Sequence, residues 1–188
     1  MAVTFANIVV GEGTLFVGSN TGGAATYDVG ATQEGVTISW EPDMVDIEVD
    51  QFGDAARVIQ SKVKVMVKTT LAENSLSNLA LAWGYAASTT YGDSNVASNK
   101  AGLTSTTALN FGIHNVIPEE RKLVVTGPAA GSTAAVPKTR TYSCNRAVSY
   151  NSTEIAHQRT ENAKLAVEFR ILPDPTQTGK EYGTISEA

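Results

Sequence analysis

The chain has few of the residues from which most catalytic and metal sites are built. Its 188 residues include one cysteine, Cys144, and two histidines, His114 and His157. One cysteine excludes an intramolecular disulfide and a multi-cysteine zinc site, and the two histidines lack the close spacing of paired zinc ligands. A Cys144–His157 nucleophilic pair is conceivable, but no oxyanion-loop motif accompanies it. We expect no enzyme activity, no metal and no cofactor, with Cys144 an ordinary thiol.

Basic residues and long apolar runs are also scarce. The chain carries 14 Lys and Arg against 19 Asp and Glu, a formal net charge of -5. Neutralising phosphates requires clustered cations, so this balance disfavours a general nucleic-acid binder. The first residues do not resemble a signal peptide, and no stretch has the length of a membrane span. We therefore expect a protein that folds in a cytoplasm and does not insert into membranes.

Phosphate-loop and calcium-loop patterns are missing as well. Gly11 and Gly13 lack the third glycine and the strand-to-helix context of a dinucleotide loop. The acidic residues between positions 43 and 50 do not follow calcium-loop spacing. Carboxylates that the fold brings together could still form a hydrolase site, an alternative that the sequence leaves open.

The chain does contain many short stretches of apolar–polar alternation, which is typical of β-strands. Strands are predicted at 3–10, 14–17, 35–40, 44–50, 57–71, 108–113, 121–126, 139–150 and 164–172. Pro42 is expected to end the strand at 35–40. Pro173 is expected to end the last strand and leave a flexible polar tail at about 173–188. Loops are predicted at 18–35 and 86–107, which are rich in small and polar residues.

One segment has helical periodicity, with an apolar stripe at i, i+3, i+4 and i+7 between residues 71 and 85. The stripe consists of Leu76, Leu79, Ala80 and Trp83. Thr70 and Glu73 have capping-box spacing, and Gly84 suits the end of the helix. The whole pattern predicts a mainly β single domain over residues 1–188, a β-sandwich or barrel with one flanking helix at about 71–85.

Two segments alternate apolar with charged residues. In the first, we expect Val45, Ile47 and Val49 to face the core, which turns three carboxylates away from it: Asp46, Glu48 and Asp50. In the second, Val63, Val65 and Val67 alternate with Lys62, Lys64 and Lys68. These charges form either a solvated sheet surface with ion pairs worth under about 1 kcal/mol each, or a functional surface.

In their order, these segments resemble the major tail tube protein of long-tailed, siphovirus-like bacteriophages. The resemblance spans roughly residues 14–183 and rests on four stretches: 35–40, 45–51, 68–79 and 167–175. It implies a β-sandwich with one helix, assembled as six-membered rings whose sheets join around a lumen. The rings stack into a tube in the virion tail, assembled in the host cytoplasm.

The resemblance also implies partners. These are other copies of the chain, other phage tail proteins, and double-stranded DNA that passes through without specific binding. An acidic lumen would let DNA slide, whereas a basic one would hold its phosphates. The candidates for the lumen or for ring stacking are Asp46, Glu48, Asp50, Lys62, Lys64 and Lys68.

Two other classes of protein fit the same composition. One is another β-rich virion protein, such as a tail terminator or a capsid decoration protein. The other is a carbohydrate-binding or hydrolytic β domain, in which exposed aromatic rings would stack on sugars. Trp40 and Trp83 occupy apolar positions of predicted elements, so we expect them to be structural.

Overall fold

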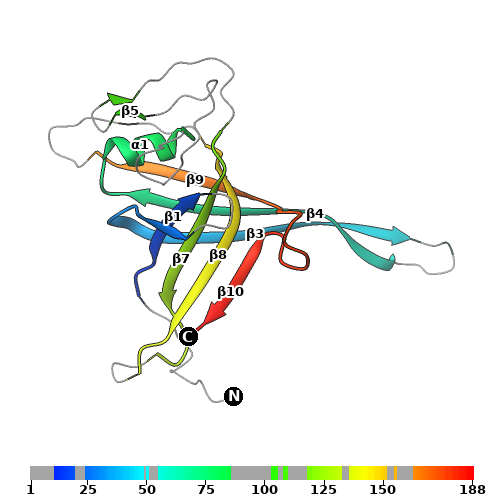
Figure 1. Cartoon of the computed structure of the whole chain (residues 1–188). Coiled ribbons are helices and arrows are strands. Elements are labelled where there is room, and N and C mark those ends of the chain that lie inside the picture. The colour runs from blue at the N-terminus through cyan, green and yellow to red at the C-terminus, as the bar shows by residue number, and fades with distance from the viewer. Residues whose placement is uncertain are drawn as a thin grey trace.

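The chain folds into a mainly β structure with a short helix, as predicted (Figure 1). The computed structural model describes residues 11–19, 24–48, 50, 55–85, 103–105, 108–109, 118–132, 136–151, 155 and 163–188. The strand predicted at 3–10, most of the loop predicted at 86–107, and both histidines lie outside these ranges.

Eight strands form one antiparallel sheet with the order β2-β1-β7-β8-β9-β4-β3, and β10 pairs with β8 beside this path. The strands are β1 (Thr14–Ser19), β2 (Ala25–Asp28), β3 (Thr32–Glu48), β4 (Ala55–Leu71), β7 (Arg121–Pro128), β8 (Thr139–Ser149), β9 (Leu165–Leu172) and β10 (Gly183–Glu187). A second, two-stranded sheet contains β5 (Leu103–Ser105) and β6 (Ala108–Leu109). The large sheet rolls up so that β1 and β3 approach each other. An opening of about 480 Å³ remains between β3 and β7, beside Gly11 and Gly13, which precede β1.

The core fills the inside of this roll, under the helix α1 (Leu76–Ala82). Every second residue of β9 is buried, from Leu165 to Ile171, and the predicted core-facing residues of β4 are also in the core, although Met66 on the lysine side is buried as well. There, Val65 and Val67 are buried and Val63 packs against the core. Branched and aromatic side chains on one face of paired strands account for this core because extended chains turn alternate residues to the same side.

The helix begins five residues later than predicted. Thr70 belongs to β4, so its side chain cannot cap the helix. Ser75 is the N-cap instead, and its Oγ accepts a hydrogen bond from the Asn78 backbone N–H at 3.1 Å. Glu73 accepts a hydrogen bond from the Ala31 backbone N–H at 3.2 Å. Gly84, at φ 70°, follows the helix end as predicted.

Three residues of the predicted stripe contact the core: Ala80 is buried, and Leu79 and Trp83 pack against it. Leu76 is exposed, and Asn78, Leu81 and Ala82 are buried in addition. The polar Asn78 side chain is tolerated in the core because its hydrogen-bonding groups have partners. Its Oδ1 accepts a hydrogen bond from the Tyr27 hydroxyl at 2.8 Å. Its Nδ2 donates to the carbonyl oxygens of Val29 and Glu73, each at 2.9 Å. These three hydrogen bonds connect the start of the helix to the sheet.

Three strand boundaries differ from the predictions. β2 lies within the segment predicted to be a loop, because its backbone pairs with β1 despite its small residues. β3 continues through Pro42 to Glu48, because β3 is the last strand of the sheet path and needs hydrogen bonds on one side only. The predicted tail contains β10, which returns beside β8 after the turn that follows Pro173.

Candidate assembly surfaces

The most prominent surface of the chain is a two-stranded arm. It consists of residues 41–48 of β3 and 55–64 of β4, which project from the body and, among the described strands, pair only with each other (Figure 1). Both of its sides are largely exposed to solvent. Five large apolar side chains on it are 39–56% exposed: Met44, Val45, Ile47, Val58 and Ile59. Such a surface is costly in a lone subunit, so it indicates an interaction site.

The apolar residues of the arm do not face the core as predicted. We expected Val45 and Ile47 to face the core, but they are 45% and 42% exposed, and Val49 lies outside the described residues. β3 runs on past Pro42 into the arm, where both sides are exposed: Met44, on the other side from Val45, is 53% exposed. The expected core side is therefore missing because the arm projects from the body.

The six charged residues singled out in the sequence lie on the arm and on the adjoining sheet. Asp46 stands opposite Val58, and Glu48 opposite Ala55, so β4 offers neither carboxylate a cation across the ladder. All three carboxylates, Asp50 included, are exposed.

The three lysines share the outward side of β4 with acidic neighbours. Lys62 stands opposite Asp43, and Lys64 Nζ lies 3.6 Å from Glu41 Oε2. Lys68 Nζ lies 2.9 Å from Glu168 Oε1 on β9. These are cross-strand pairs at the surface, the arrangement expected of solvated sheet.

Open backbone edges lie next to the arm. β9 ends at Leu172, so β4 before Val65 has β3 as its only partner strand among the described residues. β10 continues along β8 where β9 stops, and within the described ranges its other edge is unpaired. Unpaired N–H and C=O groups on a strand edge are a template for another chain.

An apolar groove of about 190 Å³ separates β10 from the base of the arm. Its walls come from β3, β4, β8 and β10, and its apolar lining residues are Ile38, Trp40, Val65, Tyr142, Tyr182 and Ile185. Trp40 is 58% exposed and packs edge-on against Tyr182, with ring centroids 6.1 Å apart. Trp40 therefore lies beside the apolar residues Ile38 and Val65, but more than half of its surface remains uncovered. Ile185 is 68% exposed.

Cys144 lies at the floor of this groove, opposite Gly183 of β10. The cysteine is buried, and burial raises the pKa of its thiol to about 11. Its thiolate is scarce at neutral pH, so the thiol is a poor nucleophile.

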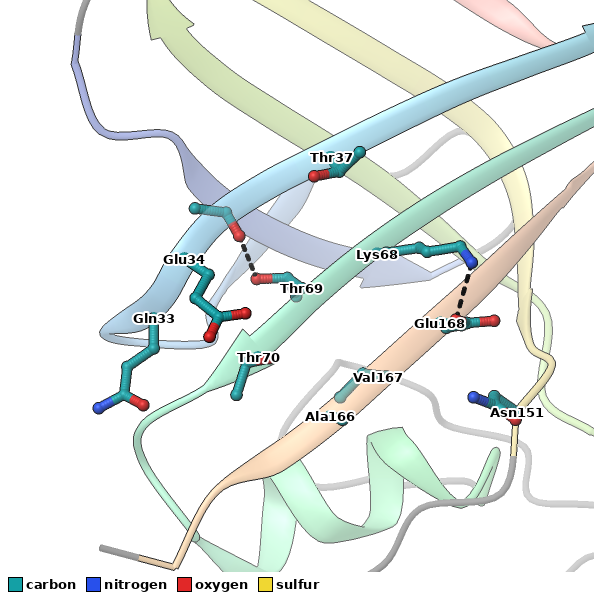
Figure 2. Close-up of a pocket in the computed structure, with 11 residues that line it drawn as sticks. Gln33, Glu34, Thr37, Lys68, Thr69, Thr70, Asn151, Ala166, Val167 and Glu168 are labelled. Atoms are coloured by element: carbon teal, nitrogen blue, oxygen red, sulfur yellow. Dashed lines mark hydrogen bonds and ion pairs between the residues drawn. The ribbon is translucent and has the colours of Figure 1, made fainter.

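A shallow polar pocket of about 180 Å³ opens on the outward side of β3, β4 and β9 (Figure 2). At its rim, Glu34 and Gly35 form a two-residue bulge in β3, with φ 65° and 73°. The Thr69 hydroxyl donates to the Gly35 carbonyl oxygen at 2.9 Å and holds this bulge. The Lys68–Glu168 ion pair also lies in this pocket. The polar groups there bond to each other, so the pocket is ordinary sheet surface.

Within the described ranges, no three His, Cys, Asp or Glu residues lie close enough together to hold a metal ion. No helix in this part of the chain is long and apolar enough to cross a membrane.

No family model and no curated protein sequence matches the chain. Among solved structures, it is similar to a chain of the anti-feeding prophage baseplate, determined by cryo-electron microscopy with sixfold symmetry. The identity is 11% and the TM-score 0.39, over 100% of this chain and 97% of the other. At this level of similarity, the match carries no argument about assembly or function.

Proposed function

We propose that this chain is a structural subunit that polymerises through its own surfaces, and that the polymer is the tail tube of a long-tailed bacteriophage. In this proposal, six copies form a ring, rings stack into a tube, and DNA passes through the lumen during delivery into the host. The chain is not an enzyme. The role is the one implied by the sequence resemblance, and the projecting arm is the observation that carries it.

The physical support comes from what the subunit leaves uncovered. An arm exposed on both sides, with five large apolar side chains, has no core of its own to pack on. The open edges of β4 and β10 leave backbone groups that another copy can satisfy. Both features are unfavourable in a monomer. They become favourable in an assembly, because the apolar side chains are buried and the strand edges are paired at the same time.

The proposal is tested with the purified full chain. Sedimentation velocity and negative-stain electron microscopy over a concentration series should show rings or hollow tubes that grow with concentration. A tail terminator or decoration protein would instead stop at a closed assembly. A monomer at every concentration would refute the proposal.

The arm carboxylates test the proposed route for DNA. If Asp46, Glu48 and Asp50 line the lumen, changing all three to Lys should leave tubes intact but slow DNA delivery, because new cations bind phosphates. If they stack rings against Lys62 or Lys64 of another copy, the same change should block tube growth, with partial rescue by the opposite change at the lysines. A triple variant that is normal in both assays would identify this surface as solvated sheet.

The exposure of Trp40 beside Tyr182 reopens the carbohydrate-binding alternative. Sugars stack on exposed rings, but they also require several polar partners around each ring, and the walls of the groove are almost entirely apolar. A glycan array separates the two functions, since the assembly proposal expects no binding above background.

A further inference from the structure

The groove between β10 and the base of the arm requires an apolar occupant. Trp40 and Ile185, on its two walls, are exposed by 58% and 68%, and its lining offers few hydrogen-bonding groups. A polar ligand would lose its water without gaining partners, whereas aliphatic side chains would cover both residues.

The occupant is also an extended chain. Among the described residues β10 pairs only with β8, so its other edge is free, and its residues Gly183 to Ile185 form one wall of the groove. Each outward backbone group there can bond to a strand laid beside it, which adds main-chain hydrogen bonds to the apolar contact.

The outward side of the arm meets both requirements. Val45 stands directly opposite Ile59, and Ile47 follows on the same side of β3. These three branched side chains are 45%, 39% and 42% exposed and form one apolar strip. The β4 strand of the arm has its own free edge, and its extended geometry gives a reach of roughly 25 Å, at about 3.3 Å per residue.

The arm cannot enter the groove of its own chain. The groove lies at the base of the arm, where Trp40 pairs with Val65, and the two strands run outward from there as a continuous ladder. The donor is therefore a second copy. On the docking side of the arm, Arg57 stands opposite Ile47 and Lys62 opposite Asp43, so the charges there are mixed and the contact depends on apolar burial and strand pairing.

We propose that the arm of one copy docks through Val45, Ile47 and Ile59 into the Trp40–Ile185 groove of the next copy, with strand pairing to β10. The proposal rests on the self-assembly proposed above and names its contact. Because donor and acceptor are different surfaces, the contact is head to tail and can repeat. It also explains why an apolar alternation in the arm has no partner in its own core.

Single substitutions separate the two surfaces. Ile185→Asp removes the acceptor and Ile59→Asp the donor. Val58→Asp is the matched control, because Val58 is adjacent in the sequence, 56% exposed, and on the other side of the arm. Burying an unpaired carboxylate should raise the protein concentration needed for assembly at least ~10-fold in the first two variants and leave the control unchanged. Circular dichroism confirms that each variant is folded.

A mixture of the Ile185→Asp and Ile59→Asp variants tests the pairing of arm and groove directly. The Ile185→Asp copy keeps a working arm and the Ile59→Asp copy a working groove, so the mixture should form a one-to-one dimer that grows no further. In a Trp83→Phe background, Trp40 is the only tryptophan, and its emission should shift to shorter wavelength in that dimer. A disulfide between Ile185→Cys on one copy and Ile47→Cys on another, with buried Cys144 silent, gives an independent readout.

The outcomes separate the two proposals. If the wild-type chain assembles, but Ile185→Asp assembles equally well or the mixture stays monomeric, the groove assignment is wrong while tube formation stands. An equal defect in Val58→Asp also overturns the assignment. A wild-type chain that stays monomeric overturns both.

Discussion

The hydrogen bonds of the Asn78 side chain should contribute strongly to the free energy of unfolding of the subunit, and Asn78→Leu removes them. Asn78 is 1% exposed and makes three side-chain bonds, with the Tyr27 hydroxyl and the carbonyl oxygens of Val29 and Glu73. Leucine has similar volume but leaves both carbonyls without these donors. At roughly 1 kcal/mol per lost bond, plus the cost of stranded carbonyls, we expect a loss of about 3–5 kcal/mol.

Urea unfolding measures this loss, at a protein concentration below that of assembly. With a slope of about 2 kcal/mol per molar urea, the midpoint should fall by roughly 2 M. Tyr27→Phe is the matched control, because it removes one bond and should cost about 1 kcal/mol. In the double variant the two losses should be less than additive. A midpoint shift in Asn78→Leu no larger than that of Tyr27→Phe would refute the reasoning.

Four other predictions test features of the sheet. Gly183→Ala should detach β10, because a Cβ there would overlap the Ser143 carbonyl oxygen at φ 141°; hydrogen exchange at 183–187 should become fast. In the wild-type chain, alkylation of Cys144 should be slow at pH 8 and accelerate toward pH 11, since its pKa is raised to about 11, and Gly183→Ala should speed it at every pH. Glu34→Gly should raise the unfolding free energy by about 0.5–1 kcal/mol, because φ 65° is strained for glutamate, and a decrease would contradict this. Lys68→Met should cost under about 1 kcal/mol, because the Lys68–Glu168 pair is partly solvated, and a larger fall in thermal stability would show that the pair is structural.

The sequence by itself determined most of the strands and the existence of the helix. Alternation in β4 and β9 identified the core residues because extended chains turn every second side chain to the same side, independently of the rest of the fold. That Cys144 is a free thiol also followed from the sequence, since a single cysteine has no disulfide partner in its own chain, whereas its burial did not.

Only the tertiary structure decided what lies at the edges of the sheet. A proline would end a strand in the middle of a sheet, but Pro42 is tolerated because β3 lies at the end of the sheet path. The sequence does not show which strand takes that position. The continuity of β3 through Pro42 carries the strand beyond the body into the arm, so Val45 and Ile47 have no core to face and are exposed. The capping site moved to Ser75 because pairing with β9 kept Thr70 in a strand.

The assembly surfaces were the least visible in the sequence. Isolated apolar residues such as Tyr182 and Ile185 in the tail were the available signal, but their pairing with Trp40 spans more than 140 residues. Strand edges and grooves arise from contacts distant in the chain, and periodicity reports only local neighbours. The sequence therefore determined which residues are apolar, and the order of strands in the sheet determined which of them remain uncovered.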